Sequence, residues 1–229
     1  MTEVNIHKDY PKTCDRHDYW GQIKRTVNGK AVSEADIEMI VSAVYNGLKL
    51  QDKYDKLLDL GCGNAALASY FYPHLLQYIG VDFSDYLIEI AQENFKHDKV
   101  KAFTVNDILG YLNQDQAPKE VTKVLCYGVM SYLSKTDIKE ALKLLYEKYE
   151  NVERVYLGNI PQRDKAKEFF SQRNIKNFEL DNCHSPIGVW WDARELSDLA
   201  KQIGWKTESK KMPNSFYATK YRFDLILTR

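Results

Sequence analysis

Apolar and polar residues alternate along most of the chain in blocks whose period switches between that of a strand and that of a helix. Short apolar runs are followed by segments in which apolar residues return every three or four positions, the spacing of an amphipathic helix. The predicted strands span 56–60, 78–82, 100–105, 121–127 and 152–157, and the predicted helices span 86–95, 135–149 and 165–173. This alternation predicts an α/β fold with a parallel sheet and helices on both of its faces.

The two ends of the chain depart from this alternation. Residues 1–32 are polar and aromatic without a period, and Ser33 and Asp36 then form a capping box that begins a helix. The apolar stripe of that helix comprises Ile37, Ile40, Val41, Val44 and Leu48. At the other end, a helix over 193–203 precedes two strands, 205–210 and 223–228, with no helix between them.

One junction between a strand and the next segment carries the candidate chemistry. Residues 56–66 read Lys-Leu-Leu-Asp-Leu-Gly-Cys-Gly-Asn-Ala-Ala, so an apolar strand containing Asp59 runs into Gly61 and Gly63 and then into a segment that we expect to be helical. Glycine tolerates the backbone angles of such a turn and lets a bulky ligand lie against the backbone. The N–H groups at a helix start favour a ligand carboxylate or phosphate. The junction therefore predicts a site for a nucleotide-like cofactor.

Two classes of cofactor fit this pattern. Gly61, Gly63 and Ala66 satisfy the dinucleotide fingerprint, and Asp82 follows Gly63 by 19 residues, so a dehydrogenase is one alternative. Asp59 argues against it, because a carboxylate at that mouth repels a pyrophosphate and attracts a cofactor that carries an ammonium group.

The two motifs together resemble those of the class I S-adenosylmethionine-dependent methyltransferases. The residues concerned are Asp59-Leu60-Gly61-Cys62-Gly63 and the strand Tyr78-Ile79-Gly80-Val81-Asp82-Phe83-Ser84. The resemblance implies a Rossmann-like, doubly wound, seven-stranded sheet, mostly parallel with an antiparallel C-terminal strand. It also implies one domain over 1–229, with an N-terminal helical lid and helix over 1–50 and a cofactor-binding α/β core over 51–229. The implied cofactor is S-adenosylmethionine, and S-adenosylhomocysteine is the implied product.

The resemblance also implies roles for individual residues. The methionyl end of the cofactor would be held by Asp59, Gly61 and Gly63, and the sulfonium would face Cys126 and Tyr127. Asp82 would accept hydrogen bonds from the ribose hydroxyls. The adenine would lie against Phe83, with its amino group near Asn106, Asp107 and Ile108. For Asp82 and Asp107 the alternative is helix N-capping, and for Cys126 it is a buried strand residue.

Two segments outside the predicted sheet are candidates for binding the methyl acceptor. Residues 17–26 combine Tyr19, Trp20, Lys24 and Arg25, and as a lid they would cover the methyl donor and bring cations to an anionic acceptor. The alternative is an ordinary solvated segment. Residues 182–191 contain His184, a candidate to take a proton from an acceptor hydroxyl; lone loop histidines are more often bystanders. Trp190 and Trp191 in this segment have the alternative of packing against the next helix.

Two local sequences bear on the substrate. The strand over 121–127 ends in Cys-Tyr-Gly-Val rather than Asn/Asp-Pro-Pro-aromatic, which argues against methylation of amino groups on DNA bases or release factors. Residues 20–30 are similar to the N-terminal region of small methyltransferases from bacterial capsular-polysaccharide loci, some of them tied to O-methyl phosphoramidate decoration. We therefore expect an O-methyltransferase that acts on a small, anionic, phosphorylated or nucleotide-linked sugar metabolite.

Three alternatives to this function stay open. An RNA methyltransferase would need a basic patch, for which the candidate residues are Lys96, Lys99, Lys101, Lys210 and Lys211. A dehydrogenase would bind a nicotinamide cofactor. A non-catalytic module would bind S-adenosylmethionine without turnover.

Composition limits the partners and the compartment. Thirty-two basic and 32 acidic residues cancel, so there is no global field to gather nucleic acid. The four cysteines stand far apart, which indicates neither a disulfide framework nor a metal site. The N-terminus is too polar for a signal peptide and no apolar run is long enough to span a bilayer, so we expect a cytoplasmic protein without a membrane partner.

Overall fold

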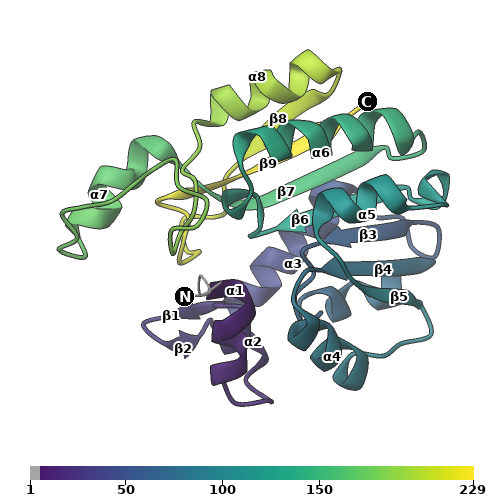
Figure 1. The fold of residues 1–229 in the computed structure, drawn as a ribbon, viewed down its shortest axis with the longest axis horizontal. Helices are drawn as coiled ribbons and strands as arrows, with labels where there is room; N and C mark the ends of the chain where they lie inside the picture. The colour runs from purple at the N-terminus through teal and green to yellow at the C-terminus, as the bar shows by residue number, and fades with distance from the viewer. Residues whose placement is uncertain (1–5) are drawn as a thin grey trace.

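The computed structural model describes residues 6–229, and its centre is a seven-stranded sheet (Figure 1). Its order is β5-β4-β3-β6-β7-β9-β8, and every neighbouring pair is parallel except those of β9, which runs antiparallel to both β7 and β8. The strands are β3 (Lys56–Leu60), β4 (Gln77–Asp82), β5 (Val100–Val105), β6 (Lys123–Tyr127), β7 (Arg154–Pro161), β8 (Lys206–Lys210) and β9 (Arg222–Thr228). The predicted sheet, including its antiparallel C-terminal strand, is confirmed.

Helices cover both faces of this sheet because successive strand residues point to opposite faces. Leu58 and Leu60 of β3 lie in a core with α5 (Ile108–Gln114), α6 (Lys135–Lys148) and α8 (Ala193–Ile203). Leu57 lies in the second core, with α3 (Glu34–Leu48) and α4 (Asp85–Asn94). Figure 1 shows α5, α6 and α8 in front of the sheet and α3 behind it. The capping box of α3 is present, since Ser33 Oγ accepts a hydrogen bond of 3.1 Å from the Asp36 N–H.

Short elements fill the N-terminal region. They are α1 (Ile6–Asp9), a 3₁₀ turn over Tyr10–Thr13, α2 (Tyr19–Gln22) and the hairpin of β1 (Thr26–Val27) and β2 (Lys30–Ala31). The hairpin turns through Asn28 and Gly29, both with positive φ, at 51° and 75°. Asn-Gly is the strongest short hairpin signal in a sequence, yet this hairpin was not among the predicted elements.

The predicted helix after the glycine turn is wrong. Residues 64–76 form two 3₁₀ turns instead, Ala68–Tyr70 and Tyr72–His74. Ala65 has a φ of 63°, outside the helical region, and the side-chain oxygen of Asn64 accepts a hydrogen bond of 3.2 Å from the Ala66 N–H. Pro73 lacks an N–H and interrupts any longer ladder. The glycine turn is therefore not followed by a helix N-terminus whose free N–H groups could bind a ligand carboxylate or phosphate.

A bulge interrupts β7 where it pairs with β9. The register shifts between Leu157 and Ile160, and Asn159 adopts a φ of 61°. The buried carboxylate of Asp224 on β9 accepts hydrogen bonds of 2.7 Å from the Asn159 N–H and from the Tyr156 hydroxyl. The bulge is thus held by two bonds to one side chain, and it turns Asn159 out of the ladder.

Other segments lie around this framework. Figure 1 shows α7 (Ala166–Ser171) extending away from the sheet, beyond the ends of α6 and α8. Further 3₁₀ turns span Pro118–Glu120, Met130–Tyr132 and Arg163–Lys165. Within residues 6–229, no helix is long and apolar enough to cross a membrane.

Candidate functional site

A cavity of about 570 Å³ lies across the carboxyl ends of the central strands. The strand order reverses at β3, whose neighbours are β4 on one side and β6 on the other, and ligands of open α/β sheets bind at such a point. Its walls come from the glycine turn, the ends of β4 and β6, His7, Tyr10 and residues 22–26 of the N-terminal region, and Tyr217, Tyr221 and Arg222. Its volume is within the range of roughly 300–1,000 Å³ found for small-molecule sites.

The glycine turn leaves no room for side chains. Gly61 has a φ of 80°, and a Cβ there would lie 2.3 Å from Val129 Cγ2. Gly63 has a φ of 58°, and a Cβ there would lie 2.8 Å from Ile23 Cγ2. Both positions therefore require glycine for conformation and for space, and the bare backbone of this turn faces the cavity.

Asp59 is a nearly dehydrated carboxyl group beneath this turn. It is 5% exposed, and the Tyr78 hydroxyl donates a hydrogen bond of 3.0 Å to its Oδ2. Burial raises the pKa of Asp59 to about 7; the Tyr78 hydrogen bond opposes the rise and the charge of Asp82 adds to it. A cationic ligand group in the cavity would restore the charge of this carboxyl group.

Asp82 closes the other side of the turn. Its Oδ2 accepts a hydrogen bond of 2.9 Å from the Gly63 N–H, and its Oδ1 accepts one of 2.9 Å from the Ser84 N–H. Burial raises the pKa of Asp82, and these backbone bonds oppose the rise. Among residues 6–229, no lysine or arginine forms an ion pair with Asp59 or Asp82.

Of the two carboxylates for which helix N-capping was the alternative, Asp107 caps a helix and Asp82 does not. Ser84 rather than Asp82 caps α4, because its Oγ accepts from the Leu87 N–H at 3.3 Å. Asp107 does cap α5, accepting from the Gly110 N–H at 2.8 Å, and it lines the cavity as well. The neighbouring predicted residues Phe83, Asn106 and Ile108 also line the cavity.

The end of β6 contributes one of its two predicted residues. Tyr127 lines the cavity, but Cys126 points into the core beneath α5 and α6 and is 2% exposed. Burial raises the pKa of the Cys126 thiol. Neighbouring strand residues face opposite sides of the sheet, and Cys126 is the buried strand residue of the alternative interpretation.

Residues 19–25 contribute two cations to the cavity, whereas their two aromatic side chains point elsewhere. Lys24 and Arg25 line the cavity. Tyr19 instead donates a hydrogen bond of 3.0 Å to Asn94 on α4, and Trp20 packs against the core that contains α3. We predicted that Tyr19 and Trp20 contact the cofactor, and the structure places both outside the cavity because they hold the segment onto the fold.

Asn64 ties this segment to the glycine turn. Its side-chain NH₂ donates hydrogen bonds of 2.8 Å to the Tyr19 carbonyl and to Gln22 Oε1, and Asn64 itself is fully buried. Gln22 is 1% exposed. Residues 19–25 are therefore packed against the turn rather than solvated.

The loop over 182–191 has a divided role. His184 is exposed on the cavity wall, with its backbone N–H donating to Asn182 Oδ1 at 2.8 Å. Trp190 and Trp191 are fully buried; Trp190 packs with Phe169 and Phe170, and Trp191 joins the core of α6 and α8. Both tryptophans therefore pack in the interior: Trp191 packs against the next helix, α8, as the alternative had it, whereas Trp190 packs against the preceding helix, α7.

Sequence reasoning missed a large part of the cavity lining. The residues missed are His7, Tyr10, Tyr132, Asn159, Tyr217, Tyr221 and Arg222. The ring of His7 lies 3.9 Å from that of Tyr132, and burial lowers the pKa of His7 to about 4. Gly158 and Asn159 inside an apolar strand are a bulge signal that the sequence offered. The tyrosines and Arg222 carry no such signal.

The lysines considered for an RNA patch lie at opposite edges of the sheet. Lys101 is on β5, one outer strand, and pairs with Glu120 at 3.0 Å. Lys210 is on β8, the other outer strand, and pairs with Glu208. These lysines do not form a single basic surface.

Part of the chain is similar to a known family of domains. Residues 58–148 match the family profile of a methyltransferase domain. No curated protein matches the chain.

Three of the similar solved structures are methyltransferases. Magnesium protoporphyrin IX methyltransferase from Synechocystis, with bound S-adenosylhomocysteine, superposes with a TM-score of 0.65 and 16% identity over 98% of each chain. A SAM-dependent methyltransferase from Archaeoglobus fulgidus has a TM-score of 0.63 and 12% identity, covering 93% of this chain and 100% of that one. The small RNA methyltransferase HEN1 has a TM-score of 0.64 and 17% identity, covering 86% of this chain and 25% of that one. The predicted Rossmann-like methyltransferase fold is confirmed.

The role of Asn64 can be tested by hydrogen exchange. We expect Asn64→Ala to speed amide exchange in peptides covering residues 15–25, because two buried partners lose their donor at a cost of about 1–3 kcal/mol each. Asn113→Ala is the matched control, since Asn113 is exposed on α5 and its amide bonds only the Leu109 carbonyl. Unchanged exchange over 15–25 in Asn64→Ala would show that this residue does not hold the segment.

Proposed function

We propose that this chain is an S-adenosylmethionine-dependent methyltransferase that transfers a methyl group to an oxygen of a small anionic metabolite. One observation carries the proposal: a single cavity is lined both by two buried carboxyl groups at the glycine turn and by the cations Lys24, Arg25 and Arg222. An acidic end suits a cofactor with an ammonium group and a ribose diol, and a cationic end suits an anionic acceptor.

The residues at the acidic end fit this cofactor. Asp59 lies where an ammonium group would be stabilised, and each oxygen of Asp82 keeps a lone pair beyond the backbone bond it accepts. Gly61 and Gly63 line the cavity, so the methionyl chain would lie against bare backbone at the glycine turn. Phe83 and Ile108 offer apolar contact to the adenine.

The dinucleotide alternative fits less well. A pyrophosphate at the turn would face Asp59 and Asp82 at short range. The segment directly after Gly63 forms 3₁₀ turns, so it offers no α-helix N-terminus whose N–H groups and dipole would bind the pyrophosphate. The match to a methyltransferase domain supports the same choice.

Catalysis would rest on positioning. S-adenosylmethionine supplies a methyl group on a cationic sulfur, ready for in-line displacement. Tyr127, Gly128 and Val129 bound the space at the end of β6, and alignment of the two reactants there would contribute about 7–11 kcal/mol. An anionic oxygen acceptor needs no base, so Lys24 and Arg25 would act by binding it. A hydroxyl acceptor would use His184 as its base, for about 10²–10⁴-fold in rate.

The cationic wall and the likeness of residues 20–30 to methyltransferases of capsular-polysaccharide loci support a phosphorylated or nucleotide-linked sugar metabolite as acceptor. HEN1 acts on small RNA, but the candidate lysines of this chain lie at opposite sheet edges. We therefore place capsular-polysaccharide biosynthesis first among the possible pathways.

The pKa of Asp59 gives a test of the cofactor site. Below pH of about 7 the free carboxyl group is protonated, whereas a bound ammonium group favours its ionised form. Binding of S-adenosylhomocysteine should then release a proton, and affinity should fall by up to about tenfold per pH unit as the pH drops below 7. Calorimetry in two buffers of different ionisation enthalpy measures this release.

Asp59→Asn is the companion variant. It should abolish the proton release and weaken binding by about 10–100-fold, because a charge-assisted hydrogen bond is lost. Proton release that persists in the variant would assign the titration to another group.

The anionic acceptor can be tested with CD₃-labelled S-adenosylmethionine. Mass spectrometry should detect label on sugar phosphates or nucleotide sugars and not on their dephosphorylated counterparts. Lys24→Ala and Arg25→Ala should each lower kcat/KM by about tenfold or more, the value of one lost charged hydrogen bond, and leave S-adenosylhomocysteine affinity unchanged. Equal labelling of neutral counterparts, or full activity of both variants, would refute the cationic wall.

A further inference from the structure

We propose that Arg25, Arg222 and Asn159 form an oxyanion-binding site for a phosphate or carboxylate group of the acceptor. The proposal deepens the proposed function and rests on it in treating the glycine turn as the cofactor end. It assigns binding roles to Arg222 and Asn159, which the sequence did not single out.

The open space above Gly128 is where these donors meet. Gly128 follows β6 with a φ of 79°, and a Cβ there would lie 3.5 Å from Arg25 Nη2 and 3.5 Å from Asn159 Nδ2. One donor comes from the N-terminal segment and the other from the β7 bulge, 134 positions further along the chain. Both face the same cavity.

Arg25 is a buried cation without a partner anion among residues 6–229. It is 7% exposed, its guanidinium lies 4.7 Å from the centre of the Tyr127 ring, and its Nε has no hydrogen-bond partner in that part of the chain. Its backbone is fixed by bonds to Trp20 and Val32. Burying a charge is costly unless it is paired, and an anionic ligand would supply the missing partner.

Arg222 and Asn159 form the second half of the site. Arg222 Nη1 donates a 2.6 Å bond to the Asn159 carbonyl, which uses one of the five donors of the guanidinium fork. Asn159 holds a left-handed backbone at the bulge, fixed by Asp224, and its side-chain Nδ2, a hydrogen-bond donor, borders the space above Gly128. Strained backbone of this kind clusters at ligand sites.

The two arginines act on the same surroundings. Burial raises the pKa of Tyr127 and of Tyr132, and the charges of Arg25 and Arg222 oppose the rise in both tyrosines. A doubly cationic pocket walled by tyrosines suits an oxyanion attached to a sugar or another ring.

The sheet order separates this site from the cofactor end. Asn159 is on β7 and Arg222 begins β9, whereas the glycine turn follows β3 and Asp82 ends β4; β6 lies between the two groups. The carboxylate of the cofactor is therefore not the anion that we assign to this site.

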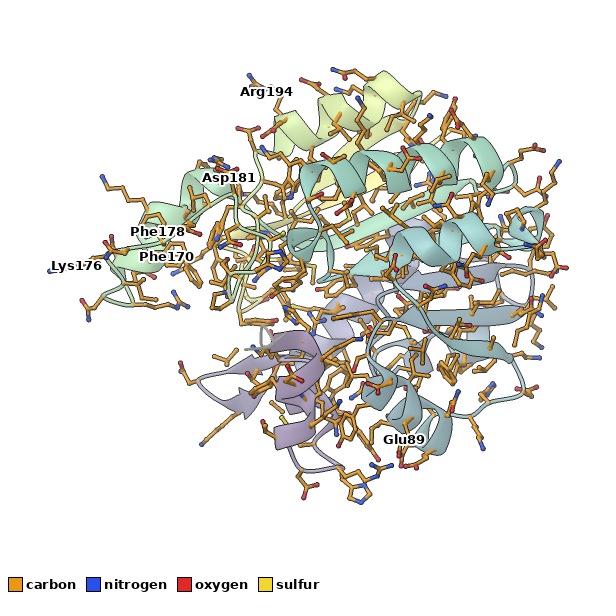
Figure 2. All side chains as sticks on the ribbon, viewed as in Figure 1. Glu89, Phe170, Lys176, Phe178, Asp181 and Arg194 are labelled. Atoms are coloured by element: carbon orange, nitrogen blue, oxygen red, sulfur yellow. The ribbon has the colours of Figure 1, made fainter. Side chains whose placement is uncertain are left out.

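The test uses inorganic phosphate and acetate as probes on the full chain saturated with S-adenosylhomocysteine, at ionic strength held constant with chloride. Titration followed by calorimetry or NMR should show saturable binding, and Arg222→Gln and Asn159→Gly should each weaken it at least about tenfold. Glycine at 159 keeps the left-handed backbone and removes only the amide. Arg194→Gln is the control, because Arg194 projects from α8 away from the cavity (Figure 2).

The outcomes separate this proposal from the proposed function. If S-adenosylhomocysteine does not bind the unaltered chain, the proposed function fails. Titration of the chain with phosphate in the absence of S-adenosylhomocysteine then still shows whether the oxyanion site exists. If cofactor binding is normal but neither probe binds, or neither variant changes probe affinity, the oxyanion site is refuted. Competition between phosphate and S-adenosylhomocysteine would also refute it, by placing the anion at the cofactor end.

Retained S-adenosylhomocysteine binding shows that a variant is folded. Should Arg222→Gln not fold, the phosphate affinities of Arg222→Lys and Asn159→Gly provide the test. Lysine keeps a donor for the Asn159 carbonyl but lacks the forked donors of the guanidinium group. Tighter binding of phosphate than of acetate would identify a phosphoryl group as the acceptor anion, and the reverse would identify a carboxylate.

Discussion

The burial of Asp59 and Asp82 on either side of one glycine turn is the constraint on which the site depends. Burial raises the pKa of both carboxyl groups, the charge of Asp82 adds to the rise at Asp59, and within residues 6–229 no lysine or arginine forms an ion pair with either one. Backbone N–H groups of Gly63 and Ser84 stabilise Asp82, and one tyrosine hydroxyl stabilises Asp59. The protein therefore stabilises these two buried carboxyl groups only in part. A ligand that carries both a cation, for Asp59, and a diol, for Asp82, would complete their stabilisation.

The rest of the cavity is assembled from segments far apart in the sequence, each fixed by a buried polar side chain. Asn64 binds the N-terminal segment to the glycine turn, and Asp224 holds the β7 bulge that presents Asn159. Asn64 and Asp224 are both buried, and their side chains make all or nearly all of the hydrogen bonds available to them. Loss of one partner from such a buried network is costly. Rigid walls of this kind suit a reaction that requires alignment of two reactants more than it requires acid–base chemistry.

The sequence predicts the framework well because its signals are local. Alternating periods locate the sheet strands within two residues at their starts, and glycine at 61 and 63 marks a turn that only glycine can make. The helix expected after Gly63 does not form, because Asn64 Oδ1 accepts a hydrogen bond from the Ala66 N–H and Ala65 takes a left-handed backbone, and composition reveals neither.

The cavity wall was predicted only in part, for a different physical reason. Asp59, Asp82 and Tyr127 end strands whose carboxyl ends must meet, so their convergence follows from parallel pairing. Tyr19 and Trp20 lie next to Lys24 and Arg25 in the chain, yet α4 and the core take the aromatic residues. Asn159 and Arg222 reach the cavity only through a bulge and an antiparallel strand, which are long-range features.

The central claim is that the glycine turn binds S-adenosylmethionine. Calorimetric titration with its demethylated product, S-adenosylhomocysteine, with NADH in parallel, tests it most directly. We predict micromolar binding of S-adenosylhomocysteine, near about −8 kcal/mol, and no detectable binding of NADH. Binding of NADH without S-adenosylhomocysteine would contradict the assignment of Asp59 and, with it, the methyltransferase function.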